Sequence, residues 1–440
     1  MDTLALAAWS FPLLLLLIFL RIPIGLSMLT LGLLGSWLVY GSLGPLLNQM
    51  KTIAYSQFSS HSLSIVPLFL LMGQFASLGG MSQALFKAGE AFLGHRKGGI
   101  AMAAIGACAG FGSICGSSLA TAATMGQVAL PELRRAGYDG GLASGALAAG
   151  GTLGILIPPS ITLILYGIAT ETSIGRLFLA GVLPGLLLTG LFVLWTLFLM
   201  WKRGFRAHAA EFRYTWKQKF QSIPKVAPFL AIVVGVMYVL YGGIATPSEA
   251  AGVGAALCVV MAMAIYRMWN PKQWWAILRD TTRESVMILM IIAASVVFGY
   301  MLTSLYLTQT LATAIAELEV NRWVLMALIN VFLLVSGCFI PPAAIILMTS
   351  PILLPIITAA GLDPVWFGVI LTINMEIGLI SPPVGLNIYV INAIAPDVRL
   401  MQIMRGAFPY VLCIVLAIVI LIVFPGIATW LPDQMMGTRH

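Results

Sequence analysis

Charged side chains are scarce in this sequence. Asp, Glu, Lys and Arg make up only 9% of the 440 residues, whereas hydrophobic residues make up 60%. A soluble domain needs a largely polar surface, so this composition excludes a sizeable soluble domain. Apolar runs of about 18 residues or more, the length of a membrane-spanning helix, recur along the whole chain. The sequence therefore predicts an all-α polytopic membrane protein embedded in a lipid bilayer.

Two further absences narrow the function. The five cysteines are scattered through apolar segments without metal or redox spacing, and no grouping of nucleophile, base and metal ligands stands out. We therefore expect neither enzyme activity nor a cofactor. The net charge of +8 is spread over loops between apolar runs, so nucleic acid is not an expected partner. The first run, 4–20, lacks a basic region before it and a cleavage site after it, and we interpret it as a retained span.

Basic residues predict the topology. The densest basic cluster, within 202–225, joins two long apolar runs, and the positive-inside rule places it in the cytoplasm. Counting spans from this cluster places every Lys and Arg on the cytoplasmic side except Lys51, Arg176, Arg322 and Arg439, and both termini outside. We predict about ten spans of sufficient length, at 4–20, 24–40, 65–80, 141–169, 177–201, 226–242, 248–266, 284–304, 365–394 and 407–425.

Two apolar segments do not fit single spans. Residues 100–130 are interrupted by the small residues of GFGSICGSS, and the charge pattern places both ends of this segment in the cytoplasm. Residues 323–356 are interrupted at SGCFIPPA, and both of their ends face outward. A re-entrant helical hairpin satisfies both constraints. We predict one hairpin entering the membrane from each side, the first with its tip near 113–118.

An internal repeat relates two further interrupted segments. At a constant offset of 224 (355 − 131), identical residues recur in pairs: Pro131 and Pro355, Gly137 and Gly361, Asp139 and Asp363, Gly154 and Gly378, and Pro158–Pro159 and Pro382–Pro383. Proline breaks a helix, and non-helical backbone at membrane depth survives only when it is buried in protein or lines a wet cavity. In the predicted topology the two copies cross in opposite directions. Inverted repeats with broken helices are typical of secondary transporters, whose sites lie between the two halves.

The hairpin tips and helix breaks carry the candidate site residues. Freed carbonyls together with hydroxyl and amide oxygens suit Na⁺, and half-helix N-termini attract an anion. The candidate Na⁺ residues are Ser113, Gly116, Thr152, Gly154, Ser336, Gly337, Asn374, Glu376, Gly378 and Ser381. The candidate substrate contacts are Ser117, Ser118, Thr121, Pro158, Pro159, Ser160, Pro341, Pro342, Pro383 and Asn387.

Glu376 stands apart because it is an acid within a predicted span. Such a group is costly in a membrane and is functional by default. Na⁺ binding and proton coupling are both open roles for it. The structural alternative is an acid at a helix end that is hydrated by a cavity or paired with a cation.

Four motifs resemble one transporter family. GSICGSSLATAATMG, GGTLGILIPPS, SGCFIPPAAIILMTSPILLPI and NMEIGLISPPVGLN together resemble the large membrane subunit, or M subunit, of the tripartite ATP-independent periplasmic (TRAP) transporters, and the resemblance covers nearly the whole chain. It implies the inverted-repeat ion-transporter-superfamily fold in a bacterial inner membrane. It further implies Na⁺-coupled elevator uptake of an organic acid, such as a C4-dicarboxylate, sialic acid or another sugar or keto acid. The implied partners are a soluble periplasmic substrate-binding protein and a small four-helix membrane subunit.

The resemblance also implies a scaffold and a moving transport subdomain. Scaffold helices are expected at 1–80 and 177–304, with the cytoplasmic basic loop at 202–225 and arm helices at 81–99 and 305–322. The transport subdomain is expected to hold hairpins at 100–130 and 323–356 and broken helices at 131–176 and 357–396, followed by the last helix and C-terminal tail at 397–440.

Two other classes stay open. A self-sufficient Na⁺/dicarboxylate symporter of the same superfamily would need no partners, but such carriers resemble one another through Ser-Asn-Thr at the hairpin tips, which this chain lacks. A channel gives no reason for two hairpins that enter from opposite faces. Because the chain begins almost at its first span, we expect the small subunit to be a separate polypeptide. The sequence does not select one organic acid.

Overall fold

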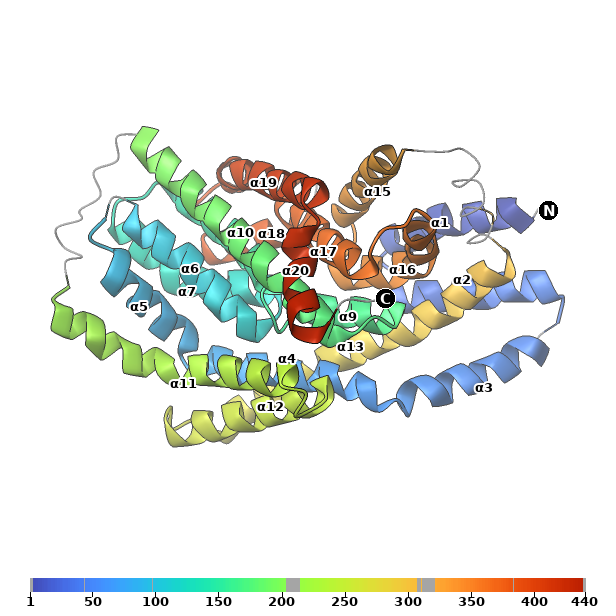
Figure 1. Ribbon diagram of the computed structural model, residues 1–440, viewed down its shortest axis with the longest axis horizontal. Coiled ribbons are helices and arrows are strands. Elements are labelled where there is room, and N and C mark those ends of the chain that lie inside the picture. The colour runs from blue at the N-terminus through green and yellow to red at the C-terminus, as the bar shows by residue number, and fades with distance from the viewer. Residues whose placement is uncertain are drawn as a thin grey trace.

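The computed structural model describes residues 3–42, 44–96, 98–202, 214–306, 310, 321–382 and 384–437. Within these residues all regular structure is helical (Figure 1). In chain order the helices are α1 (Thr3–Phe19), α2 (Ile24–Tyr40), α3 (Gly44–Phe58), η1 (His61–Ser64), α4 (Ile65–Leu78), α5 (Met81–Leu93), α6 (Gly99–Cys115), α7 (Ser118–Arg135), α8 (Gly140–Thr152), η2 (Leu153–Ile155), α9 (Ile161–Thr170), α10 (Ile174–Lys202), α11 (Trp216–Tyr241), α12 (Pro247–Ala264), α13 (Pro271–Ser304), α15 (Arg322–Gly337), α16 (Pro342–Ala359), α17 (Pro364–Ile380), α18 (Leu386–Ile394), α19 (Leu400–Val423) and α20 (Gly426–Met436).

Fewer described helices are long and apolar enough to span a membrane than the sequence predicts. Among the described residues, five helices are long and apolar enough to cross a membrane, or up to seven if each of two bent pairs is one span. Others, such as α2 and α17, are apolar but shorter. The count of about ten and the orientation of the termini stay predictions.

Three segments differ from the sequence analysis. The predicted loop 202–225 is helical from Trp216 onward, because α11 starts there with Thr215 as its N-cap. α3 and α20 were not predicted, since the former is too polar for a span and the latter lies in the expected C-terminal tail. Most of the second arm helix, predicted at 305–322, falls outside the described residues.

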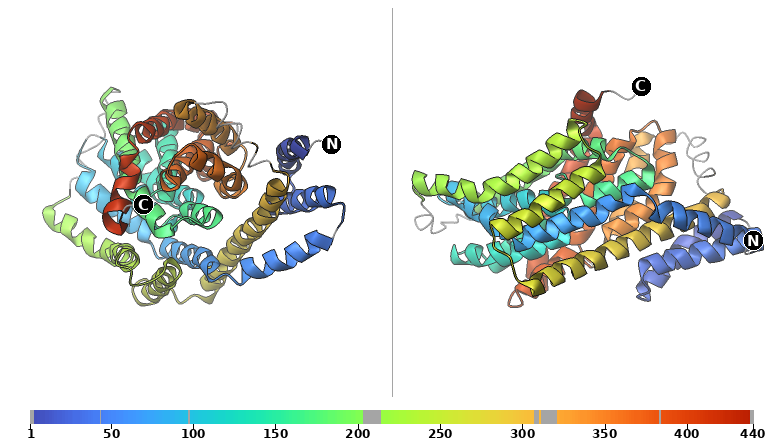
Figure 2. Two further views of the ribbon diagram at one scale, coloured as in Figure 1. Left: turned by 45° about the vertical axis from the view of Figure 1, so that its right-hand side comes forward. Right: turned by 90° about the horizontal axis from the view of Figure 1, so that it is seen from below.

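The helices form one body with projecting ends. α2 lies along α13, α4 along α12, and α5 along α6, while α8 packs between α7 and α19. Figure 2 places α1–α3 at the side opposite α5–α7. Within the interrupted segments α6–α9 and α15–α18, most side chains of α6, α8 and α17 are buried, whereas one side of α15 is exposed. Most of the described candidate residues therefore lie in the core, but Pro341 is exposed, and Ser117, Ser336, Pro342 and Ser381 are partly exposed.

Helix ends recur at the offset of the sequence repeat. Four pairs of helix ends are 224 residues apart (342 − 118, for example). These are the starts of α7 and α16 (Ser118 and Pro342), the ends of α7 and α16 (Arg135 and Ala359), the starts of α8 and α17 (Gly140 and Pro364), and the ends of α9 and α18 (Thr170 and Ile394).

The matched Gly-x-Asp residues explain two of these boundaries. Gly137 and Gly361 adopt φ values of 85° and 70°, a left-handed conformation that favours glycine and reverses the chain after a helix. Asp139 and Asp363 then cap the next helix, because their carboxylates accept hydrogen bonds from its first backbone N–H groups. The same turn chemistry thus starts α8 and α17.

Candidate functional site

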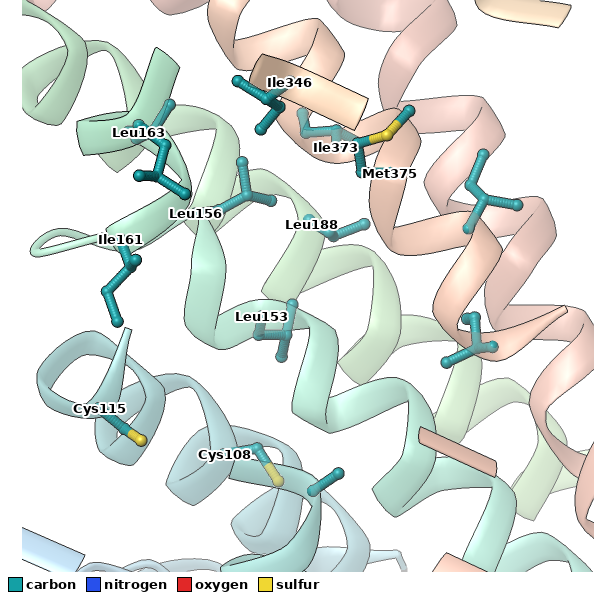
Figure 3. Close-up of a cluster of buried hydrophobic side chains, with 14 of the residues drawn as sticks. Cys108, Cys115, Leu153, Leu156, Ile161, Leu163, Leu188, Ile346, Ile373 and Met375 are labelled. Atoms are coloured by element: carbon teal, nitrogen blue, oxygen red, sulfur yellow. The ribbon is translucent and has the colours of Figure 1, made fainter. Parts of the chain in front are cut away.

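Each broken helix contains a short non-helical segment. In the first, α8 ends at Thr152, η2 follows, and α9 begins at Ile161 after the buried prolines Pro158 and Pro159. Ser160 caps α9, since its Oγ accepts a hydrogen bond from the Leu163 N–H at 3.2 Å. Apolar side chains surround this break: Figure 3 shows Cys115 of α6 near Ile161.

The second break lies between α17 and α18. α17 ends at Ile380 and α18 begins at Leu386, after Gly385 in the left-handed conformation with φ 60°. Ser381 is partly buried, and its Oγ lies 3.5 Å from the Sγ of Cys338 at the tip of the second hairpin. Pro383 falls outside the described residues.

Glycine pairs hold each hairpin against its break. A Cβ atom on Gly154 would lie 2.7 Å from the Cα of Gly112 on α6 and 2.9 Å from the Oγ1 of Thr121 on α7. A Cβ atom on Gly378 would overlap the carbonyl group of Gly337 on α15. Backbone meets backbone at both places, so the first helix of each hairpin is fixed beside a break.

The hairpin tips are built differently. At the first tip, Gly116 has φ 61°, lies against the Pro159 carbonyl and precedes Ser117, whose Oγ accepts from the Ala120 N–H and caps α7. At the second tip, Pro341 is the N-cap of α16 and Pro342 its first residue, with no side-chain cap. The carbonyl of Ser336 accepts the N–H groups of residues 339 and 340 and closes the preceding turn.

A hydrogen-bonded cluster joins the two halves. Ser118 Oγ, at the start of α7, donates to Glu376 Oε2 on α17 at 2.9 Å. Asn387 Nδ2, on α18, donates to Ser118 Oγ at 2.9 Å and to the Ala148 carbonyl on α8 at 3.1 Å. These three side chains are 0–2% exposed. The structure thus brings two candidate substrate contacts and one candidate Na⁺ residue together.

Oxygen atoms of this cluster are left without donors. Within the described part of the chain, Glu376 Oε1 and Asn387 Oδ1 are buried and accept no hydrogen bond. No ion pair between described residues includes Glu376. Glu376 is fully buried and lies four residues inside α17, so its carboxyl group is not at the helix end. A buried carboxyl group without a counter-charge favours a bound proton or cation.

Several candidate hydroxyls bond within their own helices instead. Thr152 Oγ1 donates to the Ala149 carbonyl at 2.6 Å, and Ser113 Oγ donates to the Gly110 carbonyl at 2.7 Å. Thr121 is fully buried where α7 meets Gly154. These contacts stabilise local structure, and the remaining lone pairs of each oxygen can still accept.

Asn330 is a site residue that the sequence analysis missed. Asn374 Nδ2 donates to Asn330 Oδ1 at 2.7 Å and to the Asn330 carbonyl at 3.1 Å, which ties α17 to α15. Asn374 Oδ1 is buried and has no donor among the described residues. The signal was a lone amide inside the apolar run MALINVFLLV. Such a side chain in a membrane helix needs a partner.

The arrangement offers neutral oxygens and one carboxyl group rather than a transition-metal site. Among the described residues no three His, Cys, Asp or Glu side chains group together. Carbonyl, amide and carboxyl oxygens suit a hard cation such as Na⁺. The arrangement can therefore bind an alkali cation between two parts of the chain that lie far apart in the sequence.

Comparisons with known proteins agree on one family. The family model described as "Tripartite ATP-independent periplasmic transporter, DctM component" matches residues 11–427. The chain is 35% identical to the C4-dicarboxylate TRAP transporter large permease protein DctM of Pseudomonas aeruginosa, over 88% of this chain and 91% of that protein. It is 30% identical to the sialic acid TRAP transporter large permease protein SiaM of Vibrio cholerae, over 96% and 97% of the two chains.

A solved structure shares the fold. The YdaH transporter of Alcanivorax borkumensis superposes with a TM-score of 0.60 at 16% sequence identity, covering 89% of this chain and 90% of that one. At this identity the likeness concerns the fold alone.

The ectoine TRAP transporter large permease protein TeaC of Halomonas elongata is a further relative, 30% identical over 95% of this chain and 96% of TeaC.

Proposed function

The chain belongs to the DctM component family of the tripartite ATP-independent periplasmic transporters, and from this premise we propose that it couples Na⁺ entry to the uptake of a small organic acid. The observation that carries the proposal is the Ser118–Glu376–Asn387 cluster. Its unpaired oxygens lie where the two halves meet, and a cation bound there would compensate the buried carboxyl group.

Na⁺ would contact oxygens from both halves of the chain. Glu376 Oε1 and Asn387 Oδ1 are the first candidates because they lack donors among the described residues. The carbonyls at the two breaks and the Asn374 side chain are further candidates. A bound ion would strengthen the connection between α7 and α17–α18, which favours one arrangement of the hairpin tips.

We propose an elevator motion in which α6–α9 and α15–α18 move together. The glycine contacts and the Ser118 cluster connect these segments into one body. A cavity of about 810 Å³ separates part of that body, at α9 and α16, from η1, α13 and the end of α3. The cavity wall is rich in hydroxyl groups, and the space between the two bodies supports the proposed motion.

The proposed partners are a soluble substrate-binding protein and a small membrane subunit on a separate chain. The family name describes a tripartite periplasmic transporter, which supports both partners. One relative, the isethionate permease DctMQ of Oleidesulfovibrio alaskensis, is longer, since this chain covers 63% of it. We propose that the extra length of such proteins corresponds to a fused small subunit.

The proposed substrate is a small organic acid. Relatives at 30–35% identity are named for C4-dicarboxylates, sialic acid and ectoine, so similarity alone does not choose among them. A C4-dicarboxylate, sialic acid or another sugar or keto acid is expected. The first N–H groups of α18 have no side-chain cap and can meet a carboxylate, whereas Pro341 and Pro342 at the start of α16 carry no N–H, which leaves Ala343 as its first donor.

Reconstituted uptake tests this function. The chain is placed in liposomes under an inward Na⁺ gradient, alone, then with its small subunit, then with the binding protein as well. Labelled succinate and sialic acid are the first probes. Uptake by the complete mixture only, abolished when the Na⁺ gradient is collapsed, is the expected result. Uptake by the chain alone would instead establish a self-sufficient symporter.

The ion site has its own test. We expect Na⁺, but not K⁺ or choline, to raise the thermal unfolding midpoint of the purified chain, because a ligand of the folded state stabilises it. Glu376→Gln retains the shape of the side chain but should remove most of this Na⁺ effect. Thr152→Ser, a control that retains its hydroxyl, should keep it. An unchanged Na⁺ effect in Glu376→Gln would exclude the carboxyl group as a ligand.

Accessibility of the tips tests the motion. Single cysteines are introduced at Ser117 and Pro341 and labelled from each side of the membrane. The five native cysteines are buried, so background labelling should be low. Opposite changes at the two positions, as Na⁺ and substrate are varied, are expected for an elevator. Constant labelling at both positions would contradict it.

A further inference from the structure

A polar cavity lies away from the proposed transport site. Its volume is about 450 Å³, and its walls are α5, the C-terminal end of α7 and the first part of α11 with Tyr214. The lining residues are Lys87, Glu90, Ala91, Glu132, Arg135, Tyr214, Gln218, Gln221, Ser222 and Lys225. The predicted topology places this end of the molecule in the cytoplasm.

The charges around the cavity are not paired with one another. Each wall contributes a cation: Lys87 from α5, Arg135 from α7 and Lys225 from α11. Glu90 and Glu132 are the acids. None of these five side chains forms an ion pair with another described residue. Three cations and two acids around one cavity match a ligand that bears both a phosphate and an ammonium group.

Glu90 is held at the bottom of this arrangement. It is only 5% exposed although it lies on the amphipathic helix α5. Its Oε1 accepts a hydrogen bond from the Tyr214 hydroxyl at 2.9 Å. This bond fixes the start of α11 against α5. The cavity therefore has a defined floor rather than only mobile surface side chains.

An apolar cavity adjoins the polar one. It has a volume of about 440 Å³ and shares Lys87, Ser222 and Lys225 with the first. Its other lining residues are Gly79, Gly80, Gln83, Ala84, Pro224, Pro228, Ile265 and Tyr266, most of them without charge or hydroxyl. The two cavities together suit an amphiphile, with its polar head in the first and the start of an acyl chain in the second.

The first part of α11 has the features of a membrane interface. Trp216, Phe220 and Ile223 are 70%, 61% and 42% exposed. Lys219 Nζ lies 4.7 Å from the ring centroid of Trp216. The helix bends by 45° after Pro228, so this part runs at an angle to the rest. Exposed aromatic and basic side chains gather at the depth of lipid headgroups.

We propose that this pair of cavities binds phosphatidylethanolamine from the cytoplasmic leaflet. The phosphate would be bound by Lys87, Arg135 and Lys225, and the ammonium group by Glu90 and Glu132. The lipid would connect α7, which continues from the first hairpin tip, to α11. The proposal does not depend on Na⁺ coupling or on the transported substrate.

Mass spectrometry of co-purified lipid tests the site. The full chain is purified from bacterial membranes in mild detergent, and retained phosphatidylethanolamine is quantified per chain. Lys87→Gln with Arg135→Gln should reduce retention about tenfold, since two charge-assisted hydrogen bonds are lost. The matched control is Lys272→Gln with Arg283→Gln, two exposed cations on α13 on the same predicted side. Equal retention in the two variants would overturn the proposal.

The unmodified chain provides a second test that needs no variant. After delipidation, its thermal unfolding midpoint is measured with phosphatidylethanolamine, phosphatidylglycerol, a galactosyl diacylglycerol with the same acyl chains, and inorganic phosphate. The largest rise should occur with phosphatidylethanolamine. An equal rise with inorganic phosphate would identify free phosphate as the ligand, and an equal rise with either other lipid would exclude the paired-charge recognition. Each of these results would overturn the proposal.

Discussion

The two interrupted halves share a framework but differ in chemistry. In α6–α9 and in α15–α18, a glycine of the break meets a glycine of the hairpin, and the helices start and end at matched positions. In the first half, however, Ser117 and Ser160 cap the helices that follow the tip and the break. In the second half, Pro341 and Gly385 occupy those places and provide no side-chain cap.

This difference in capping suggests that the first half stabilises the framework and the second half provides most of the binding groups. The first half caps its own helices after the tip and the break, and contributes a hydroxyl, Ser118, to the shared cluster. The second half contributes the carboxyl and amide groups of Glu376 and Asn387, whose free oxygens have no donor among the described residues. A repeated backbone can thus hold one half rigid while the other provides most of the groups that bind a ligand. Substitutions in the two halves should therefore have different consequences.

Adding a methyl group at the glycine contacts should have the largest effect on the free energy of unfolding. Gly378→Ala places a methyl group on the Gly337 carbonyl, where neither backbone can move without shifting a helix. We expect a loss of about 3 kcal/mol in the free energy of unfolding. Gly154→Ala should lose less, because its nearest atom, Gly112 Cα, lies 2.7 Å from the added Cβ. The measurement is the thermal unfolding midpoint in detergent.

A matched control lies on α6. Gly106→Ala adds a methyl group where no atom lies within 4 Å, so it should leave stability unchanged or raise it by up to about 1 kcal/mol through helix propensity. If Gly378→Ala unfolds at the same temperature as Gly106→Ala, the second half does not depend on its glycine contact. The shared framework would then be limited to the first half.

Loss of the Ser118 hydroxyl, which connects the two halves, should have a smaller effect on the free energy of unfolding. Ser118→Ala leaves Glu376 Oε2 without its donor and should destabilise the chain by about 2 kcal/mol. Ser160→Ala removes only a cap within the first half and should cost about 1 kcal/mol. The two serines are both buried, which makes the comparison direct.

A double-mutant cycle separates the bridge from the cap. Combined with Asn387→Ala, the Ser118→Ala change should show a coupling free energy of about 1 kcal/mol or more, because the two side chains are in contact. Ser160→Ala combined with Asn387→Ala should be additive within about 0.5 kcal/mol. Equal coupling in the two cycles would mean that the cluster does not join the halves.

Local sequence signals predicted the positions of the breaks but not of the turns. The doubled prolines predicted the two breaks. Gly137 with Asp139, and Gly361 with Asp363, were used only as matched residues of the repeat, and the structure shows that each pair forms a left-handed turn followed by a helix cap. The run GPLLNQMKTIAYSQF of α3 was missed because its polar residues hide a helix that is not a simple span. Hydropathy measures burial in lipid and not helix formation itself.

The partners within the site could not be predicted in the same way. Ser118 lies 258 residues from Glu376 and 269 residues from Asn387, and only the packing of α7 against α18, which follows α17, brings them together. Each residue was a candidate on its own, but no local pattern links them. Asn330 was missed for the same reason, since its importance depends on Asn374 from another helix.

Titration of Glu90 should have the smallest effect on the free energy of unfolding. Glu90 lies on α5, the helix that packs along the first hairpin. α5 packs along α6, and burial raises the pKa of Glu90 above its ordinary value. Between the ordinary and the raised pKa the folded chain holds more protons than the unfolded one, so stability falls as the pH rises through this window. Glu90→Gln removes this penalty and should gain about 1 kcal/mol or less on the wild type between pH 4 and pH 7. The Tyr214 pKa of about 12 keeps its hydroxyl protonated throughout, so ionisation of Tyr214 does not contribute to the measured change in unfolding midpoint. Hydrogen exchange should slow in α5 and leave α16 unchanged; a gain that is constant with pH would mean that the effect comes from packing and not from ionisation.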